Sequence, residues 1–221
     1  MRVCAFDLDH TLVSTPLDLA AMAADMRAHL ERCGAGPPAR EERYRVGELL
    51  RFCKSRVPAH EPALWALALE RERLAMDEAT LESGALVAVA GVRRLGFVTA
   101  LWTNNAGAVT RAALERLGLA EHFDLVVTRD EMRALKPDPD GWRVIAGHAD
   151  GATAHTSRQT FMVGDSWVDG LAAAAASVSF IAYRADAAEL SRWKIEPVAT
   201  LTDLAALPNW LVGHADSDGR H

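Results

Sequence analysis

Short apolar segments that do not alternate with polar residues recur along this chain, and each is followed by polar or turn-forming residues. Such segments are typical of strands that are buried on both faces of a parallel sheet. They occur at residues 2–6, 97–102, 123–128, 160–163 and 178–182. Helical patterns stand between them, at residues 106–117, 139–148 and 166–176. This alternation predicts an α/β fold in which a parallel sheet is covered by helices on both faces.

Residues 16–82 interrupt the alternation, because they contain no convincing strand and instead show helical patterns separated by turn-rich breaks. We expect an inserted helical bundle, with one apolar face on each of its first and third helices. The residues expected on these faces are Leu19, Met22, Met26 and Leu30 in the first helix, and Leu64, Leu67, Arg71 and Leu74 in the third. The α/β domain then comprises residues 1–15 and 83–212, and the polar residues 213–221 are predicted to form a mobile tail.

The overall composition disfavours several classes of function. A net charge of −6 at pH 7 argues against a surface that binds nucleic acid. Asp7 and Asp9 interrupt the N-terminal apolar segment before a signal peptide could develop. The apolar stretch at residues 84–102 carries Arg93 and Arg94 near its middle, where they would be costly in a membrane. We therefore expect a soluble, cytoplasmic protein, a monomer or weak homodimer, with no nucleic-acid or membrane partner.

The three cysteines, Cys4, Cys33 and Cys53, are odd in number and show no CxxC spacing. They predict reduced thiols in a cytoplasmic setting, rather than a disulfide framework or a metal held by sulfur. The histidines other than His10 show no spacing typical of a metal site.

The first residues that could carry chemistry follow the strand at residues 2–6. Asp7 and Asp9 are separated by one residue, and an extended chain sends alternate side chains to the same face. The two carboxylates could therefore converge on one substrate, with one attacking and the other transferring a proton. Considered alone, the pair is equally compatible with loop acids near a helix start.

Two further groups lie at a strand end and a helix start. Thr103 and Asn104 follow the strand at residues 97–102, where a hydroxyl and backbone amides can bind a phosphoryl oxygen, although both are ordinary turn residues. Lys136 precedes two prolines, Pro137 and Pro139, at the start of a helix. A rigid loop could direct its ammonium toward carboxylates and phosphate, and the alternative is a solvated lysine.

The most specific group follows the strand at residues 160–163. Asp165 stands at the strand end and Asp169 one helical turn later, a spacing that lets both face one oxygen-bound cation, directly or through water. A single acid at a helix N-terminus is also a common partner of the helix dipole, so Asp169 has a plain structural interpretation.

These groups are expected to meet, because the loops after parallel strands emerge at the same edge of a sheet. Together they resemble the four motifs of the haloacid dehalogenase-like superfamily: DLDHT at residues 7–11, Thr103, Lys136 with its proline, and GDSWVD at residues 164–169. The resemblance spans nearly the whole chain and is closest to the phosphoglycolate-phosphatase-like branch. It implies a Rossmann-like core, with residues 16–82 as a cap that closes over the site and selects the substrate.

The resemblance also implies catalytic roles. Asp7 would attack phosphorus and form an aspartyl-phosphate, and Asp9 would act as acid and base. Thr103 and Lys136 would bind the phosphoryl group, with Asn104 as a further candidate contact.

The metal implied is Mg²⁺, because the candidate ligands are carboxylates, a backbone carbonyl and water, without a thiolate or histidine cluster. The carboxylates of Asp7 and Asp165, the backbone carbonyl of Asp9, and Asp169 in direct or water-mediated contact would hold it. The ion would orient the substrate and neutralise charge.

His10 departs from the family pattern, in which this position is often glycine. It is a candidate contact to the substrate or the cap, and the alternative is a structural or solvated role. Basic residues of the cap could also meet an anionic substrate, or could form a solvated face of ion pairs. They are Arg40, Arg43, Arg45, Arg51, Lys54 and Arg56.

The function that these features favour is a magnesium-dependent phosphatase acting on a small phosphorylated metabolite. Asp9 favours phosphoryl transfer over carbon–halogen cleavage, because dehalogenases of the family lack an acid at this position. Two alternatives stay open: a phosphomutase of the same family, and a catalytically silent binding or regulatory member. A silent member would be expected to have lost Asp7, Asp9, Lys136 or Asp165.

Overall fold

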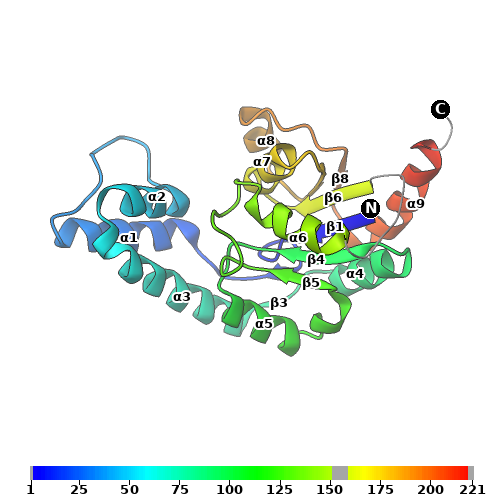
Figure 1. Ribbon diagram of the computed structural model, residues 1–221, viewed down its shortest axis with the longest axis horizontal. Helices are drawn as coiled ribbons and strands as arrows, with labels where there is room; N and C mark the ends of the chain where they lie inside the picture. The colour runs from blue at the N-terminus through cyan, green and yellow to red at the C-terminus, as the bar shows by residue number, and fades with distance from the viewer. Residues whose placement is uncertain (1, 151–158, 219–221) are drawn as a thin grey trace. The chain divides into compact units, whose positions relative to one another are not determined.

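The computed structural model describes residues 2–150 and 159–218. Within these ranges, a six-stranded sheet of parallel strands has the order β5-β4-β1-β6-β7-β8 (Figure 1). Its strands are β1 (Arg2–Phe6), β4 (Val98–Trp102), β5 (Leu125–Val127), β6 (Gln159–Gly164), β7 (Ser179–Tyr183) and β8 (Ala199–Leu201). The predicted strands agree with the first five to within two residues at each end. The sequence did not predict β8, which has only three residues.

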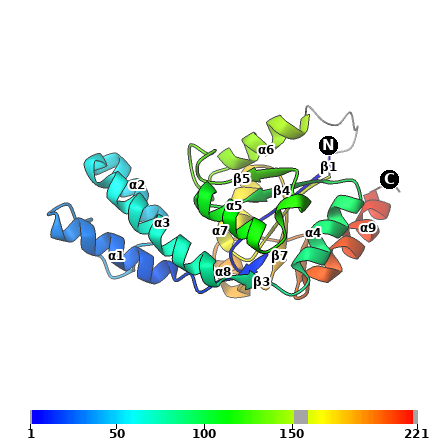
Figure 2. The ribbon, with the colours of Figure 1, turned by 90° about the horizontal axis from the view of Figure 1, so that it is seen from below.

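Helices cover both faces of this sheet, which confirms the predicted α/β architecture. They are α4 (Ala85–Arg94), α5 (Gly107–Arg116), α6 (Asp140–Asp150), α7 (Trp167–Ala175), α8 (Ala187–Arg192) and α9 (Leu207–Asp218). On one face, Val3, Ala5 and Met162 share a buried apolar cluster with residues of α6 and α7. On the other face, the ring of Phe161 contacts Trp210 of α9, and α9 lies beside α4 (Figure 2).

The strand order places a topological switch point at β1. From β1 the chain passes to β4 and β5 on one side, and then returns to the other side of β1 to form β6, β7 and β8. Loops that diverge in this way open a crevice at the carboxyl ends of the strands, where α/β proteins commonly bind ligands. The register brings these ends together, because Phe6 pairs with both Leu101 of β4 and Val163 of β6.

The chain divides into two compact units, of which Pro16–Glu78 is the second. We call Pro16–Glu78 the cap unit and the described residues on either side of it the core unit. The predicted boundary lay after residue 82, whereas the contacts place it after Glu78. Residues on either side of the cap unit, β2 (Val13–Ser14) and β3 (Thr80–Leu81), pair as a short antiparallel ribbon that belongs to the core unit.

The cap unit is helical, with α1 (Leu19–Arg32), α2 (Val46–Arg56), a 3-10 turn at Pro58–His60, and α3 (Glu61–Glu78). Met22, Met26 and Leu30 are buried on α1 as predicted, but Leu19 is exposed. The face predicted for α3 was partly wrong. Leu74 is exposed, and the residues buried on this helix are Leu64, Ala68, Glu72, Ala75 and Met76.

The predicted tail also differs from the structure. The helix α9 extends to Asp218, so residues 213–218 are helical rather than a mobile tail, and residues 219–221 lie outside the described part. The ring of His214 stacks on Trp210 at 4.6 Å and contacts Phe161. An aromatic contact of a polar residue therefore provides the anchor that the sequence pattern did not reveal. Among residues 2–150 and 159–218, no helix combines the length and the apolar character that a membrane crossing requires.

Candidate active site

Asp7 is the first residue after β1, at the centre of the sheet. Its backbone N–H donates to the carbonyl of Val163 at 2.9 Å, which continues the pairing between β1 and β6 by one residue. Thr103 and Asp165 occupy the equivalent positions directly after β4 and β6. In the continued register Thr103 and Asp165 lie one residue further along than Asp7, so the three predicted residues lie at the same edge of the sheet.

Lys136 joins two of the acids in a buried ionic cluster. Its Nζ donates to Asp7 Oδ1 and to Asp169 Oδ1, both at 2.6 Å. The side chains of Lys136 and Asp169 are each 2% exposed and that of Asp7 is 11% exposed. Charged hydrogen bonds that are this well shielded hold a fixed geometry, because leaving any one of the groups unpaired would be costly. The two carboxylates therefore hold the Lys136 ammonium in one direction, and the side chain is not solvated.

Asp169 is fixed from its other side by the start of α7. Ser166 is the N-cap of this helix, and its hydroxyl donates to Asp169 Oδ2 at 2.6 Å while its backbone N–H donates to the same oxygen at 3.2 Å. This reciprocal capping arrangement satisfies N–H groups that a helix start leaves open. Both carboxylate oxygens of Asp169 thus accept hydrogen bonds, one from Lys136 and one from Ser166.

Two asparagines after β4 hold parts of the site in place. The side chain of Asn104 binds the backbone of Lys136 twice: it accepts from the Lys136 N–H at 2.9 Å and donates to the Lys136 carbonyl at 3.1 Å. The amide of Asn105 donates to Asp9 Oδ2 at 2.7 Å. Asn104, predicted as a substrate contact, is thus engaged in positioning the lysine loop. Asn105 orients Asp9, a role that the sequence did not predict.

Hydroxyl groups also lie at this edge. Thr103 is buried, and its Oγ1 accepts from the Asn105 N–H at 3.2 Å, which tightens the turn after β4. Thr11 Oγ1 lies 3.5 Å from Asp165 Oδ1, at the outer limit of a hydrogen bond. Thr11 stands within the DLDHT segment, and its position near Asp165 was not predicted from the sequence.

The acids carry more negative charge than Lys136 can offset. Burial raises the pKa of Asp7 to about 6, an effect that the nearby Lys136 reduces and Asp169 increases. Burial raises the pKa of Asp165 to about 8, with repulsion from Asp169 and Asp7 adding to it. Burial alone would lower the pKa of Lys136, but Asp169 and Asp7 outweigh it and raise the pKa, so the ammonium stays charged. An additional cation would therefore stabilise the ionised acids.

The carboxylates fit a hard divalent ion. One oxygen from each of Asp7, Asp165 and Asp169 lies within 4.8 Å of the other two. Oxygens bound to one Mg²⁺ at about 2.1 Å lie about 3.0 Å apart when adjacent and about 4.2 Å apart when opposite. The observed limit of 4.8 Å exceeds the longer of these separations by about 0.6 Å. Oxygen ligands without sulfur or imidazole suit Mg²⁺.

His10 has a backbone that explains why glycine is common at this position in the family. Its φ is 57°, in the left-handed region, and its N–H donates to the Val13 carbonyl at 2.8 Å in a tight turn. Residues other than glycine adopt this conformation at a cost, although histidine is among the more tolerant. The His10 side chain is exposed.

The chain matches the model of a hydrolase family, the haloacid dehalogenase-like hydrolases, over residues 1–177. It is 31% identical over 222 residues to a phosphoglycolate phosphatase of Chromobacterium violaceum. The aligned region covers 92% of this chain and 96% of that protein. It is 30% identical over 230 residues to a phosphoglycolate phosphatase of Neisseria meningitidis. The aligned region covers 96% of this chain and 90% of that protein.

Solved structures share the fold. A hydrolase from Pseudomonas syringae superposes with a TM-score of 0.65 at 21% identity, covering 96% of this chain and 99% of that one. A protein from Haemophilus somnus, described as a predicted phosphoglycolate phosphatase, gives a TM-score of 0.63 at 16% identity, covering 95% and 97%. At these identities the structures support the architecture alone. Taken with the family match and the relatives above, they place the chain in the haloacid dehalogenase-like hydrolase family, on its phosphoglycolate-phosphatase-like branch, as a phosphoric monoester hydrolase.

Proposed function

We propose that the protein is a Mg²⁺-dependent phosphatase that hydrolyses a small phosphorylated metabolite through an aspartyl-phosphate on Asp7. The observation that carries this proposal is the buried cluster at the carboxyl end of β1, in which Lys136 Nζ lies 2.6 Å from both Asp7 and Asp169. Phosphoglycolate is the first substrate to test, because the relatives from Chromobacterium violaceum and Neisseria meningitidis are named for it.

Asp7 is the proposed nucleophile. Its carboxylate attacks phosphorus, a bond forms between the carboxylate oxygen and phosphorus, and the bond from phosphorus to the alcohol oxygen of the substrate breaks. A pKa of about 6 keeps most of the carboxylate ionised at neutral pH. Lys136 fixes the orientation of Asp7 and offsets the charge that the phosphoryl group brings.

Asp9 is the proposed acid and base. It protonates the departing alcohol oxygen in the first half of the reaction, and in the second half it takes a proton from the water that attacks the phosphorylated Asp7. The hydrogen bond from Asn105 at 2.7 Å supports this assignment, because it fixes one oxygen of Asp9 and so the direction of the carboxylate. Water attack releases inorganic phosphate and returns Asp7 to its starting form.

Mg²⁺ would be held by Asp7, Asp165 and the backbone carbonyl of Asp9, and when bound it would neutralise phosphate charge and orient the phosphoryl group. We assign Asp169 an indirect part, through Lys136 and a metal-bound water, because both of its carboxylate oxygens already accept hydrogen bonds. Thr103 and Lys136 would bind the phosphoryl oxygens. Asn104 would act by positioning Lys136, and His10 would contact the substrate.

The filled site favours an active enzyme over a silent member of the family. The described site contains a carboxylate at each position proposed for the nucleophile and the acid, a buried cation, and a carboxylate cluster of metal-binding dimensions. A phosphomutase would share these groups but would return the phosphoryl group to a sugar, so release of inorganic phosphate separates the two activities.

The test is a phosphate-release assay on phosphoglycolate and a generic aryl phosphate, with Mg²⁺ and then with a chelator. We expect hydrolysis that depends on Mg²⁺ and that falls by about four orders of magnitude or more in Asp7→Asn, as is usual when a covalent nucleophile is removed. A circular-dichroism spectrum would show that the variant is folded. Turnover that persists in Asp7→Asn would refute the assignment of the nucleophile, and turnover of aryl phosphate without phosphoglycolate would refute the substrate alone.

A further inference from the structure

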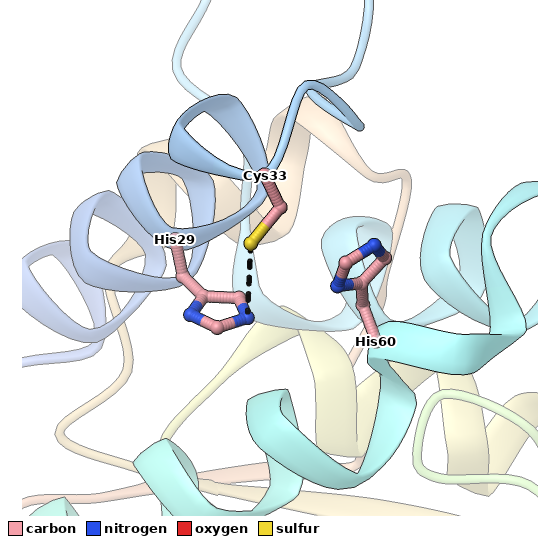
Figure 3. Close-up of side chains that lie close together, drawn as sticks. All are labelled: His29, Cys33 and His60. Atoms are coloured by element: carbon pink, nitrogen blue, oxygen red, sulfur yellow. Dashed lines mark hydrogen bonds between the residues drawn. The ribbon is translucent and has the colours of Figure 1, made fainter.

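A second group of metal-binding side chains lies in the cap unit. His29 is in the last turn of α1, Cys33 caps the end of that helix, and His60 closes the 3-10 turn before α3. Figure 3 shows the three side chains directed toward one another from these two segments. One ligand atom from each lies within 4.8 Å of the other two, and Cys33 Sγ is 3.9 Å from His29 Nε2.

The packing of the cap unit holds these side chains near each other. His29 and Cys33 are four residues apart on α1 and therefore share a face of the helix. Asp25 stands one turn before His29 on the same face, and it forms an ion pair with Arg71 that ties α1 to α3. The rings of His29 and His60 meet edge to face, with centroids 6.0 Å apart. Both rings are half-buried, so much of their freedom is already lost before any ion binds.

The dimensions are close to those of a tetrahedral zinc site. With Zn–S near 2.3 Å and Zn–N near 2.05 Å, ligand atoms around one ion lie about 3.6 Å apart for sulfur and nitrogen and about 3.3 Å apart for two nitrogens. The observed 3.9 Å between Cys33 Sγ and His29 Nε2 requires a shift of a few tenths of an ångström. The remaining spacings are at most 4.8 Å, and the side chains that span them are exposed or half-buried, which leaves them room to rotate toward an ion.

We propose that His29, Cys33 and His60 bind a borderline-soft transition-metal ion, Zn²⁺ by preference, in the cap unit. One thiolate and two imidazoles suit Zn²⁺ and not Mg²⁺, which prefers oxygen. Binding releases the thiol proton of Cys33 to solvent and leaves the imidazoles neutral. Cys33 is exposed, so water can complete the fourth position. The partial negative charge at the C-terminus of α1 also favours a cation there.

This site differs in its chemistry from the proposed catalytic site. It uses a different class of ligand from the carboxylates around Asp7, and it joins the end of α1 to the start of α3 within one compact unit. The ion would act as a cross-link of the cap helices. No local pattern in the sequence indicates this group, because the spacing of His29 and Cys33 on one helix is completed only by His60, about thirty residues later.

The test uses the full chain, reduced and with saturating Mg²⁺ to occupy the oxygen-ligand site. Zn²⁺ binding is measured by competition with a chromophoric chelator, and Co²⁺ binding by its absorption spectrum. We expect one tight equivalent of Zn²⁺ and a thiolate-to-cobalt charge-transfer band. Cys33→Ser should abolish the band, and Cys33→Ser, His29→Ala and His60→Ala should each weaken Zn²⁺ binding by about tenfold or more, since even outer-shell changes commonly cost that much.

The matched controls are Cys53→Ala, a buried thiol of the same unit, and His148→Ala, an exposed histidine of α6. Both should keep the band and the affinity. A charge-transfer band that survives in Cys33→Ser would overturn the proposal, as would Zn²⁺ affinity that is equal in wild type, Cys33→Ser and His60→Ala. Magnesium-dependent phosphate release by Cys33→Ser, measured on the same preparation, reports that the protein is folded.

Discussion

Lys136 of the core unit and Arg40 of the cap unit both pair with carboxylates at short distance, but their surroundings differ. Lys136 is 2% exposed and lies 2.6 Å from Asp7 and Asp169. Arg40 is 33% exposed, pairs with Glu48 at 2.7 Å and lies over the Tyr44 ring. Water screens the second pair and not the first. Short contact alone therefore does not mark a candidate functional cation, whereas contact combined with burial and an excess of acids makes Lys136 a candidate.

The same comparison separates the interpretations that the sequence left open. Lys136 had a solvated alternative, and its burial among acids is incompatible with that alternative. Arg40 was one of six basic residues of the cap that could meet a substrate, and its bonds to Glu48 and to the carbonyls of Glu42 and Arg43 fit a local structural role.

The largest expected difference between the two cations is in catalysis and stability together. Lys136→Met should lower kcat by about two to three orders of magnitude, because a preorganised charge beside the reacting phosphoryl group is lost. It should also lower the free energy of unfolding of the metal-free protein by about 3–5 kcal/mol, because buried carboxylates lose their partner. Steady-state kinetics and urea unfolding with a chelator measure both effects.

Arg40→Ala is the matched control for this substitution. Its kcat should equal that of the wild type, and its free energy of unfolding should fall far less than that of Lys136→Met, because the pair with Glu48 is partly screened by water. If Arg40→Ala were as damaging as Lys136→Met, burial would not be the feature that distinguishes the two pairs.

The second expected effect is a pH dependence of Mg²⁺ binding. In the metal-free protein the pKa of Asp7 is raised to about 6 and that of Asp165 to about 8, so binding must release protons at lower pH. Affinity should be constant above pH 8, fall about tenfold per unit between pH 8 and 6, and fall more steeply below pH 6. Calorimetric titration at several pH values measures this, and a pH-independent affinity would contradict the raised pKa values.

The same raised pKa values determine whether stability rises or falls with pH. In the metal-free protein, the two carboxyls bind protons more tightly when folded than when unfolded. Their contribution to stability is complete below about pH 4, where the unfolded carboxyls are also protonated, and is lost as pH rises through 6 and 8. Added Mg²⁺ should therefore raise the unfolding midpoint more at pH 8 than at pH 6.

The smallest expected effect concerns positioning. Asn104→Ala removes two hydrogen bonds to the backbone of Lys136, each worth about 1 kcal/mol, so kcat should fall by about thirtyfold at most. The charge of Lys136 is kept, so KM for the substrate should change little. A loss as large as that of Lys136→Met would mean that Asn104 contacts the substrate itself.

The sequence predicted the central part of the site because that part depends on local patterns. Buried strands end at Phe6, Trp102 and Gly164, and the parallel register then places the following residues together. The bond between Asn105 and Asp9 joins residues 96 positions apart, and asparagine is common in any turn, so no local signal marks it. The reciprocal cap of Ser166 and Asp169 could have been found from its spacing.

The predictions for α3 and for the C-terminal segment were wrong because tertiary packing decides between similar helical patterns. On α3, Ala68 and Ala75 are buried while Leu74 is exposed, because small residues allow close packing that hydrophobicity alone does not indicate. At the C-terminus, His214 packs on the aromatic rings of Trp210 and Phe161 and extends a helix into a segment that appeared purely polar in sequence.

The central claim is that Asp7 is the residue that carries the phosphoryl group. Quenching the enzyme during turnover of phosphoglycolate, reducing it with borohydride and sequencing the peptides by mass spectrometry tests this directly, because reduction converts an aspartyl-phosphate into homoserine. We expect homoserine at position 7 alone, and none without substrate. Homoserine at position 9 or 165, or rapid turnover without any modified aspartate, would contradict it.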